Sequence, residues 1–276
     1  MGFQINTNTA ANTAYRNLSS TQGDMSKSLE KLSSGLRINR AADDAAGLAI
    51  SEGLRSQIGG LGVAARNAQD GISVVQTAEG ALTEVHSILQ RVRDLAVQSG
   101  NDSNNSDARD AIKAEVTALS EELTRIGNST NFNGTKLLDG SADLTFQVGA
   151  GSTAANDQIG VDLTGANIST LGTTVGALNF DSAANALTTI AALDTEITAV
   201  SKSRSELGAV QNRFESAINS INVSQENLSA AKSRITDTDM AKEMADFTRS
   251  NILSQAGTAM LAQANQMNQG VLQLLR

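Results

Sequence analysis

Apolar side chains recur every seven residues through the second half of this 276-residue chain, and no other feature restricts its fold as strongly. A strict seven-residue repeat aligns these side chains along one seam of a helix and predicts a left-handed supercoil with a partner helix. At 1.5 Å of rise per residue, the seam is about 65 Å long. Its members are Leu193, Val200, Leu207, Phe214, Ile221, Leu228 and Ile235.

The first half of the chain carries a matching seam, which consists of Leu54, Leu61, Ala68, Val75, Leu82, Leu89 and Ala96. A second apolar row lies about 100° around the same helix and needs another partner. That row contains Val74, Ala81, Ile88 and Leu95. A third helix can supply the partner, with an N-cap at Ser106 and a stop at Gly127-Asn128. We expect this helix to form an antiparallel hairpin on the long one.

The middle of the chain has a different pattern, in which apolar and polar residues alternate. The segments "DLTFQVGAG" and "DQIGVDL" alternate as half-buried strands do, and a hairpin is expected between them. From Leu137 to Ser201 there is no Lys or Arg but there are seven carboxylates. Because their spacing does not match a calcium loop, a solvated outer face is favoured over cation binding.

These patterns predict a mainly α fold, a long antiparallel helical coiled-coil bundle with a small β-hairpin region in the middle of the chain. The core helical domain is expected at 43–235. Its helices are expected at about 43–99, 106–127 and 183–235, and its β-hairpin region at about 139–175.

Both ends of the chain are patterned as amphipathic helices, through Leu18, Met25, Leu32, Leu253, Met260, Met267, Val271 and Leu274. We expect residues 1–42 and 236–276 to pair as a terminal coiled-coil domain, with a spoke near 33–46. Because an isolated pair would expose apolar faces to water, these ends are expected to order only when many copies bundle together.

The adjacent carboxylates Asp43 and Asp44 raise the question of an acid pair in an active site. They precede an Ala-rich periodic run, and no third carboxylate or histidine lies near them in the sequence. An aspartate oxygen can accept the free N–H groups at a helix start, where negative charge also suits the helix dipole. A helix start is therefore the favoured interpretation, with Arg37 and Arg40 within reach of a local ion pair.

The composition excludes several kinds of chemistry and argues against some partners. The chain has no cysteine and one histidine, so it cannot build a thiolate site, a two-histidine metal site or a Cys-His dyad. We expect no cofactor, no metal and no enzyme activity. A net charge of −8 without a basic stripe argues against nucleic acid, and no apolar run is long enough to cross a bilayer.

Long blocks at both ends resemble bacterial flagellin. They include "LSSGLRINRAADDAAGLAISEGLRSQIGGL" at 32–61, "NAQDGISVVQTAEGAL" at 67–82, "NFNGTKLLDG" at 131–140 and "GAVQNRFESAINSINVSQENLSAAKSRITDTDMAKEM" at 208–244. The closing "QANQMNQGVLQLLR" resembles the family as well, whereas about 141–190 resembles nothing specific.

The resemblance implies a structural subunit that polymerises into the flagellar filament for motility, in a short form without outer variable domains. In that family the termini form an inner tube, and residues 37–50 correspond to the spoke between tube and core. Subunits leave the cell unfolded through the flagellar type III apparatus, which fits the missing cleaved signal and implies an extracellular filament. The implied partners are other copies of the chain, the hook-associated junction and cap proteins, and an export chaperone.

The block "LQRVRDLAVQ" resembles the flagellin segment that the flagellin-sensing Toll-like receptor of animal hosts recognises. The resemblance implies that Gln90, Arg91, Leu95 and Glu115 contribute to receptor recognition and to packing between subunits. Asp94 stands where many recognised members have Glu, which is a small departure from the family pattern.

Three other kinds of protein fit the sequence less well. The hook–filament junction protein has related terminal halves, but the uninterrupted flagellin blocks favour the filament subunit. A metalloprotease inserted in the variable region would need a His-Glu-x-x-His signature, which a single histidine cannot supply. A membrane-active translocon coiled coil would need an apolar span that the chain does not have.

Overall fold

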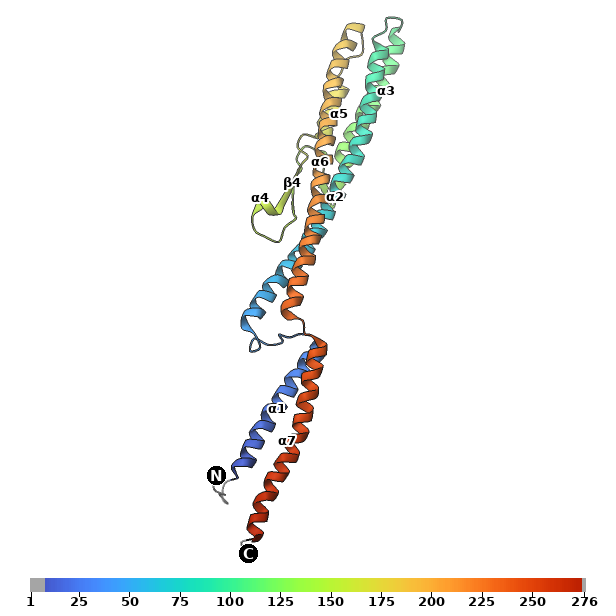
Figure 1. The fold of residues 1–276 in the computed structure, drawn as a ribbon. Coiled ribbons are helices and arrows are strands. Elements are labelled where there is room, and N and C mark those ends of the chain that lie inside the picture. The colour runs from blue at the N-terminus through green and yellow to red at the C-terminus, as the bar shows by residue number, and fades with distance from the viewer. Residues whose placement is uncertain (1–7, 275–276) are drawn as a thin grey trace. The chain divides into compact units, whose positions relative to one another are not determined.

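The computed structural model describes the backbone of residues 8–274 and the side-chain environments of residues 8–266. Within that part the fold is mainly α, as predicted (Figure 1). The helices are α1 (Thr9–Ser34), α2 (Ala45–Ser99), α3 (Ser106–Ser129), α4 (Ala154–Asp157), α5 (Ile168–Gly176), α6 (Ala183–Thr236) and α7 (Met240–Leu274). The strands are β1 (Asn131–Phe132), β2 (Thr135–Lys136), β3 (Asp143–Gln147) and β4 (Gln158–Asp162).

The chain divides into two compact units, and each is described by itself. The terminal unit comprises Met1–Ser56 and Asn227–Arg276, and the core unit comprises Gln57–Glu226. These boundaries lie within α2 and α6, whereas the sequence placed them at residues 42 and 236. The first turn of α2 belongs with the terminal unit because it packs on the segment before it, where a Cβ on Gly47 would meet Ile38 Cδ1 at 2.7 Å.

In the core unit, α2 and α6 run antiparallel and bury the two predicted heptad seams. The side chain of Phe214 on α6 lies against Gly71 on α2, and a Cβ on Gly62 would lie 3.6 Å from Gln225 Nε2 near the other end of the pair. The seam members of α2 from Ala68 to Ala96 are fully buried, and those of α6 from Leu193 to Ile221 are buried. The heptads therefore supply the interface between the two long helices, and the predicted bundle of long, packed helices is confirmed.

The third helix, α3, covers the second apolar row of α2. Val74 and Leu95 of that row are buried, and Ile112, Val116, Leu123 and Ile126 of α3 are buried in the same cluster. The N-cap of α3 is Asn105, whose side chain accepts the Ala108 N–H, and not Ser106 as predicted. Because the Asn105 side chain accepts the N–H of Ala108, three residues on, Ser106 is the first residue of the helix and not its cap.

A short helix within the predicted β-hairpin region, α5, packs closely on α3. A Cβ on Gly172 of α5 would meet Thr124 N at 2.8 Å, and one on Gly127 of α3 would meet Ser169 N at 2.6 Å. The two backbones therefore approach each other through glycines. Apolar residues of α5 are buried in this contact, namely Ile168, Leu171 and Val175. This helix lies where the sequence predicts only the β-hairpin region, so it was not predicted.

The predicted hairpin forms from β3 and β4, which pair antiparallel with Leu144 opposite Val161 and Phe146 opposite Ile159. Phe146 meets Phe214 edge to face, with ring centroids 5.6 Å apart, so the hairpin adds to the α2–α6 core. A second hairpin, β1–β2, was not predicted. Its turn is Asn133-Gly134, with φ values of 50° and 85°, which is a pair that favours this turn.

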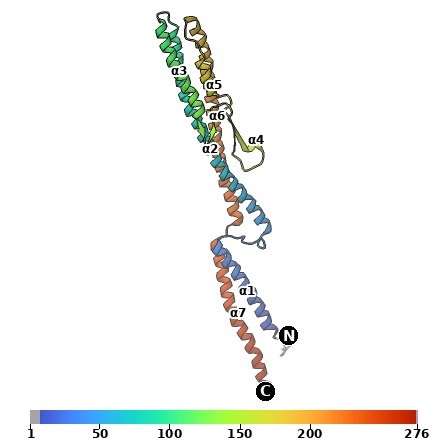
Figure 2. The ribbon, with the colours of Figure 1, turned by 180° about the vertical axis from the view of Figure 1, so that it is seen from behind.

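In the terminal unit, α1 and α7 lie side by side and antiparallel, as both ribbon views show (Figure 1 and Figure 2). The start of α1 meets the second half of α7, where the Asn8 side-chain amide donates to the Ala264 carbonyl at 3.0 Å. The other end of the pair is fixed by a β-bridge between Leu36 and Asp237. Chain segments that are far apart in sequence are thus joined at both ends of this helix pair.

Candidate assembly and recognition surfaces

The segment between α1 and α2, residues 35–44, is held by backbone hydrogen bonds to the turn between α6 and α7. Gly35 ends α1 in a left-handed conformation, with φ 74°. The Arg37 N–H donates to the Thr236 carbonyl at 2.6 Å, and the Thr238 N–H donates to the Gly35 carbonyl at 3.0 Å. The guanidinium of Arg37 also donates to the Ile235 carbonyl at 2.7 Å. These bonds satisfy backbone groups of both connecting segments at once.

Asp43 and Asp44 both accept backbone hydrogen bonds in this segment. Asp44 precedes α2, and its Oδ1 accepts the Gly47 N–H at 2.8 Å, as an N-cap does. Asp43 Oδ2 accepts the N–H groups of Arg40 and Asn39, and these bonds hold the pKa of that carboxyl below its ordinary value. The two carboxylates therefore serve separate backbone sites and do not form an acid pair.

The arginines near this helix start do not pair with Asp43 or Asp44, which corrects the expected local ion pair. Arg40 Nε lies 2.9 Å from Glu30 Oε1, on the last turns of α1. Arg37 is directed to a backbone carbonyl instead. Each aspartate uses one oxygen to accept backbone N–H groups, and the arginines bind other acceptors.

The seam between α1 and α7 contains few fully buried apolar side chains. On α1, Leu18, Met25 and Leu32 are half-buried along it. A Cβ on Gly257 of α7 would meet Leu18 Cδ1 at 3.3 Å, so α7 presents a residue without a side chain to this leucine. Ala264 is the buried apolar residue of α7 among those described. The pair thus buries little apolar surface of its own.

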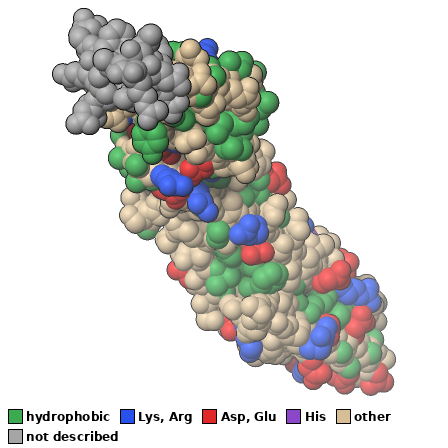
Figure 3. Space-filling view, turned by 90° about the horizontal axis from the view of Figure 1, so that it is seen from below, with side chains coloured by type: hydrophobic (Ala, Val, Ile, Leu, Met, Phe, Trp, Pro, Cys, Tyr) green, Lys and Arg blue, Asp and Glu red, His purple; other side chains and the backbone are tan. Residues whose placement is uncertain are grey.

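Two of the α7 residues expected in the terminal coiled coil lie outside this seam. Leu253 is 52% exposed and Met260 is 67% exposed, and Met244 and Ile252 are also exposed. A heptad pattern marks a stripe on a helix but does not say which neighbour covers it, and here α1 covers a different stripe. In the space-filling view, green apolar side chains reach the surface among polar and charged ones (Figure 3). Met267, Val271 and Leu274 lie outside the residues whose side chains are described.

The structure brings Arg91 of α2 and Glu115 of α3 together at the surface of the core unit. Arg91 Nε and Nη2 both donate to Glu115 Oε1, at 2.9 and 2.7 Å. Gln90 is exposed and its amide lies 2.9 Å from His86 Nε2. Leu95, by contrast, is only 2% exposed and belongs to the core cluster. The surface patch therefore consists of Gln90, Arg91 and Glu115, and Leu95 is buried in the core beneath this part of the surface.

Ion pairs tie α2 to α6 along the edge of their seam. Arg93 Nε lies 2.6 Å from Asp194 Oδ1, and this hydrogen bond raises the pKa of the arginine. Arg204 lies 3.8 Å from Glu79. His86, the single histidine, lies between these pairs on α2 and is half-buried. These polar residues replace apolar ones on one side of the seam and fix the register of the two helices.

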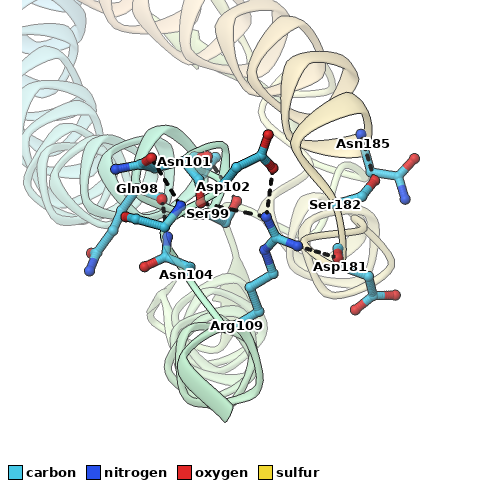
Figure 4. A network of polar contacts seen from close by, with 11 residues as sticks. Gln98, Ser99, Asn101, Asp102, Asn104, Arg109, Asp181, Ser182 and Asn185 are labelled. Carbon is cyan, nitrogen blue, oxygen red and sulfur yellow. Dashed lines mark hydrogen bonds and ion pairs between the residues drawn. The ribbon is translucent and has the colours of Figure 1, made fainter. Parts of the chain in front are cut away.

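A polar network that the sequence did not predict surrounds Arg109 (Figure 4). Arg109, in the first turns of α3, donates to the Asp181 carbonyl at 3.2 Å and lies 3.3 Å from Asp102 Oδ1. It therefore links the α2–α3 turn to the segment before α6. Asn104 fixes the same turn by donating to the Gln98 carbonyl at 2.6 Å. The Asn- and Asp-rich turn "NDSNNS" next to an arginine was the available signal.

The acidic middle of the chain is only partly a solvated face. Its carboxylates stay at the surface, and Asp139 and Asp162 cap turns through Ser141 and Thr164, whose hydrogen bonds lower the pKa of each acid. Its apolar side chains are buried, including Val161. Over the described residues, no three His, Asp or Glu side chains are grouped to hold a metal ion. Within the same part, no helix is long and apolar enough to span a bilayer.

Comparison with known proteins shows which family this chain is similar to. A family model for the bacterial flagellin N-terminal helical region matches residues 5–143, and one for the C-terminal helical region matches residues 190–275. Flagellin of Halalkalibacterium halodurans is 55% identical over 273 residues, which cover 99% of each chain. Flagellin of Bacillus subtilis is 50% identical over 307 residues, covering 99% of this chain and 100% of the relative.

A solved structure shares the fold at low identity. It is a putative flagellar hook-associated protein from Vibrio parahaemolyticus, with a TM-score of 0.58 and 14% identity. The match covers 71% of this chain and 100% of that one. At this identity the likeness concerns the fold alone.

Proposed function

The chain belongs to the bacterial flagellin family and is a structural subunit of the flagellar filament, not an enzyme; we propose that it polymerises through the exposed apolar sides of α7 in its terminal unit. The observation that carries this proposal is the contrast between burial and exposure in that unit. Ile38 and Ala264 are its only buried apolar residues among those described. Nine large apolar side chains of the unit are exposed: Tyr15, Leu29, Leu36, Ile50, Met240, Met244, Ile252, Leu253 and Met260.

The exposed residues lie on more than one side of α7. At about 100° per residue, Leu253 and Met260 share one flank of the helix, and Met244 lies about 160° away on the other. The face toward α1 lies between these flanks. A helix pair with apolar flanks on both sides needs at least two different neighbours.

Two different contact faces on one subunit favour an assembly that continues from copy to copy. A self-complementary dimer would cover the same face on each partner and leave the other flank of α7 in water. A head-to-tail contact repeats and gives a ring or a helical polymer. The flagellin family forms the second kind, and the exposed flanks of α7 supply a physical reason for it.

Seeded polymerisation tests this proposal. Purified protein with sheared filament seeds should elongate into tubes visible by electron microscopy. The variant Leu253→Asp/Met260→Asp should not elongate them, because a buried carboxylate without a partner is costly. The matched variant Leu253→Met/Met260→Leu keeps both side chains apolar and should elongate. Equal elongation by the Asp variant, with unchanged circular dichroism, would contradict the proposal.

We also propose that the chain is exported unfolded through the flagellar type III apparatus and assembles outside the cell. The family relationship supports this, as it supports contacts with an export chaperone and with the hook-associated junction and cap proteins. The weakly buried terminal unit is consistent with a subunit that unfolds at low cost. Secretion by a strain with and without a working export apparatus tests it, and equal amounts in both media would contradict it.

Recognition by the flagellin-sensing Toll-like receptor of hosts is a second proposal, which rests on the resemblance of residues 89–98. The exposed patch of Gln90, Arg91 and Glu115 supports it, since arginine is enriched among the residues that dominate binding at protein interfaces. Arg91→Ala should reduce receptor signalling at least about tenfold. Arg125→Ala, which breaks the similar exposed pair with Glu122 on α3, is the matched control. Unchanged signalling after the Arg91 substitution would remove this proposal.

A further inference from the structure

The methionines of this chain are confined to one of its two units. All six are found within the residues of the terminal unit: Met1, Met25, Met240, Met244, Met260 and Met267. The core unit, although larger and apolar inside, contains none. Its cluster is built from Leu, Ile, Val, Ala and Phe, which peroxides do not attack under mild conditions. Thioether chemistry can therefore alter the terminal unit and leave the core unit unchanged.

Three of these thioethers are accessible in the single subunit. Met240 is 47% exposed, Met244 is 51% exposed and Met260 is 67% exposed. They lie on α7, and Met244 borders a shallow apolar hollow together with Ala245, Thr248, Ile252 and Leu253. Met25 differs, because it is half-buried in the seam toward α7.

We propose that Met240, Met244 and Met260 form an oxidation site that switches polymerisation off, with a peroxide as the oxidant. In this step a lone pair on the thioether sulfur attacks one oxygen of hydrogen peroxide. A sulfur–oxygen bond forms, the O–O bond breaks, and the remaining oxygen leaves as water after proton transfer. The sulfur is oxidised by two electrons and the peroxide is reduced by two.

The sulfoxide changes what the flanks of α7 can bind. It converts a flexible apolar side chain into a polar, chiral one with a strong acceptor oxygen. The apolar flanks offer such an oxygen few donors, so burying it between copies weakens the contact by about tenfold or more at each site. The isolated subunit tolerates the same change, because the oxygen there remains in water. This inference rests on the proposed function, since it assumes that the flanks of α7 meet other copies.

The same geometry predicts that the filament is protected. In the polymer the flanks of α7 are covered by neighbouring copies, so peroxide should reach the three thioethers more slowly than in the monomer. Oxidation thus acts on subunits before assembly and spares those already assembled. A sulfoxide reductase would restore assembly, because the modification is reversible.

The test compares the full-length protein with a variant that cannot be oxidised at these positions, Met240→Leu/Met244→Leu/Met260→Leu. Leucine keeps the volume and apolar character of methionine. Monomers of both are treated with hydrogen peroxide, the sulfoxides are located by peptide mass spectrometry, and elongation of seeds is measured. The treated unsubstituted protein should show a critical concentration at least about tenfold higher, and the treated variant should elongate as before treatment. Methionine sulfoxide reductases with dithiothreitol should restore the treated unsubstituted protein.

Each contrary outcome is distinct. Normal elongation by protein that carries all three sulfoxides would overturn the switch, and so would equal inhibition of the Leu variant. Equal oxidation rates in monomer and filament would overturn the protection. Failure of the untreated protein to elongate seeds would instead overturn the proposed polymerisation, and this inference with it. Circular dichroism of the treated monomer controls for damage to the core unit.

Discussion

The two units of this chain are built from similar helices, yet they bury very different amounts of apolar surface. In the core unit, thirty buried apolar residues form one cluster that includes α2, α3, α5, α6 and the β3–β4 hairpin. In the terminal unit, the described part contains only Ile38 and Ala264 as buried apolar residues. Since burial of apolar surface is the main favourable term in folding, the core unit can be stable alone and the terminal unit cannot be equally so.

The comparison shows how one sequence pattern can serve two purposes. In the core unit, each apolar stripe meets a stripe of the same chain. In the terminal unit, the stripes of α7 that carry Leu253 and Met260 have no partner within the described chain. The first arrangement stabilises the subunit, and the second leaves interaction energy for assembly.

The largest expected effect comes from removing the aromatic side chain at the centre of the core unit. Phe214 is fully buried and packs edge to face on Phe146. Phe214→Ala should lower the free energy of unfolding by about 3–5 kcal/mol, since it removes a large side chain and leaves a cavity. Urea denaturation followed by circular dichroism measures this change.

A matched substitution in the terminal unit sharpens the result. Leu18→Ala, in the half-buried α1–α7 seam, should cost the monomer less than about 1 kcal/mol. Fluorescence of Tyr15 reports on this unit separately, because the chain has one tyrosine and no tryptophan. If Leu18→Ala and Phe214→Ala destabilise the monomer equally, the contrast between the two units is lost.

A smaller effect is expected where α5 approaches α3. Gly172→Ala would bring a methyl group to 2.8 Å from Thr124 N and 2.9 Å from the Ser120 carbonyl oxygen. Backbone atoms cannot move away as a flexible side chain can, so the core unit should lose about 1–3 kcal/mol of stability. Gly208→Ala on α6 is the control, because no atom lies within 4 Å of its added Cβ. Thermal unfolding compares the two, and an unchanged midpoint for Gly172→Ala would contradict the close approach.

The sequence was sufficient to predict the long helices and their partners in the core unit. Heptad spacing fixes which side chains share a face of a helix. Two apolar seams of equal length are therefore expected to pack against each other. The short elements were harder to predict from the sequence. The β1–β2 hairpin had a usable signal in Asn133-Gly134, but α5 is rich in Thr and Gly, and its helical form depends on packing against α3.

The surface residues could be located along the helices but not assigned to their neighbours. Spacing alone placed Leu253 and Met260 in a coiled coil, whereas the α1–α7 seam uses Gly257 and Ala264. Leu95 belongs to an apolar row, and only the packing of α3 shows that this row is covered. Sequence therefore predicts faces, and the structure is required to show what each face meets.

The next effect concerns the start of α2 in the terminal unit. Asp44→Ala removes the side-chain oxygen that accepts the Gly47 N–H, so the helix start should lose about 1 kcal/mol. Asp44→Asn keeps an acceptor and should behave nearly as the unsubstituted protein. Amide hydrogen exchange at Gly47 and Leu48 measures the local change. Protection in the core unit should stay the same, and a uniform loss across both units would show that they are not independent.

The smallest effect is the response of the segment between α1 and α2 to acid. The N–H groups of Arg40 and Asn39 hold the pKa of Asp43 below its ordinary value of 3.8. Because the folded pKa is the lower one, these bonds contribute fully above pH 3.8, and the contribution is lost as the pH falls through the folded value. Asp43→Asn should remove this acid-dependent part, and an NMR titration of the Asp43 carboxyl follows it directly.

Asp162 provides the comparison within the core unit, because its pKa is lowered by Thr164 in the same way. Acid should loosen the Asp162 turn only locally, since the apolar cluster beneath it does not titrate. In the terminal unit the Asp43 bonds hold a segment with little apolar support, so fraying should spread to the first turn of α2. Equal spreading of amide exchange around both aspartates at low pH would show that the core gives its turns no added protection.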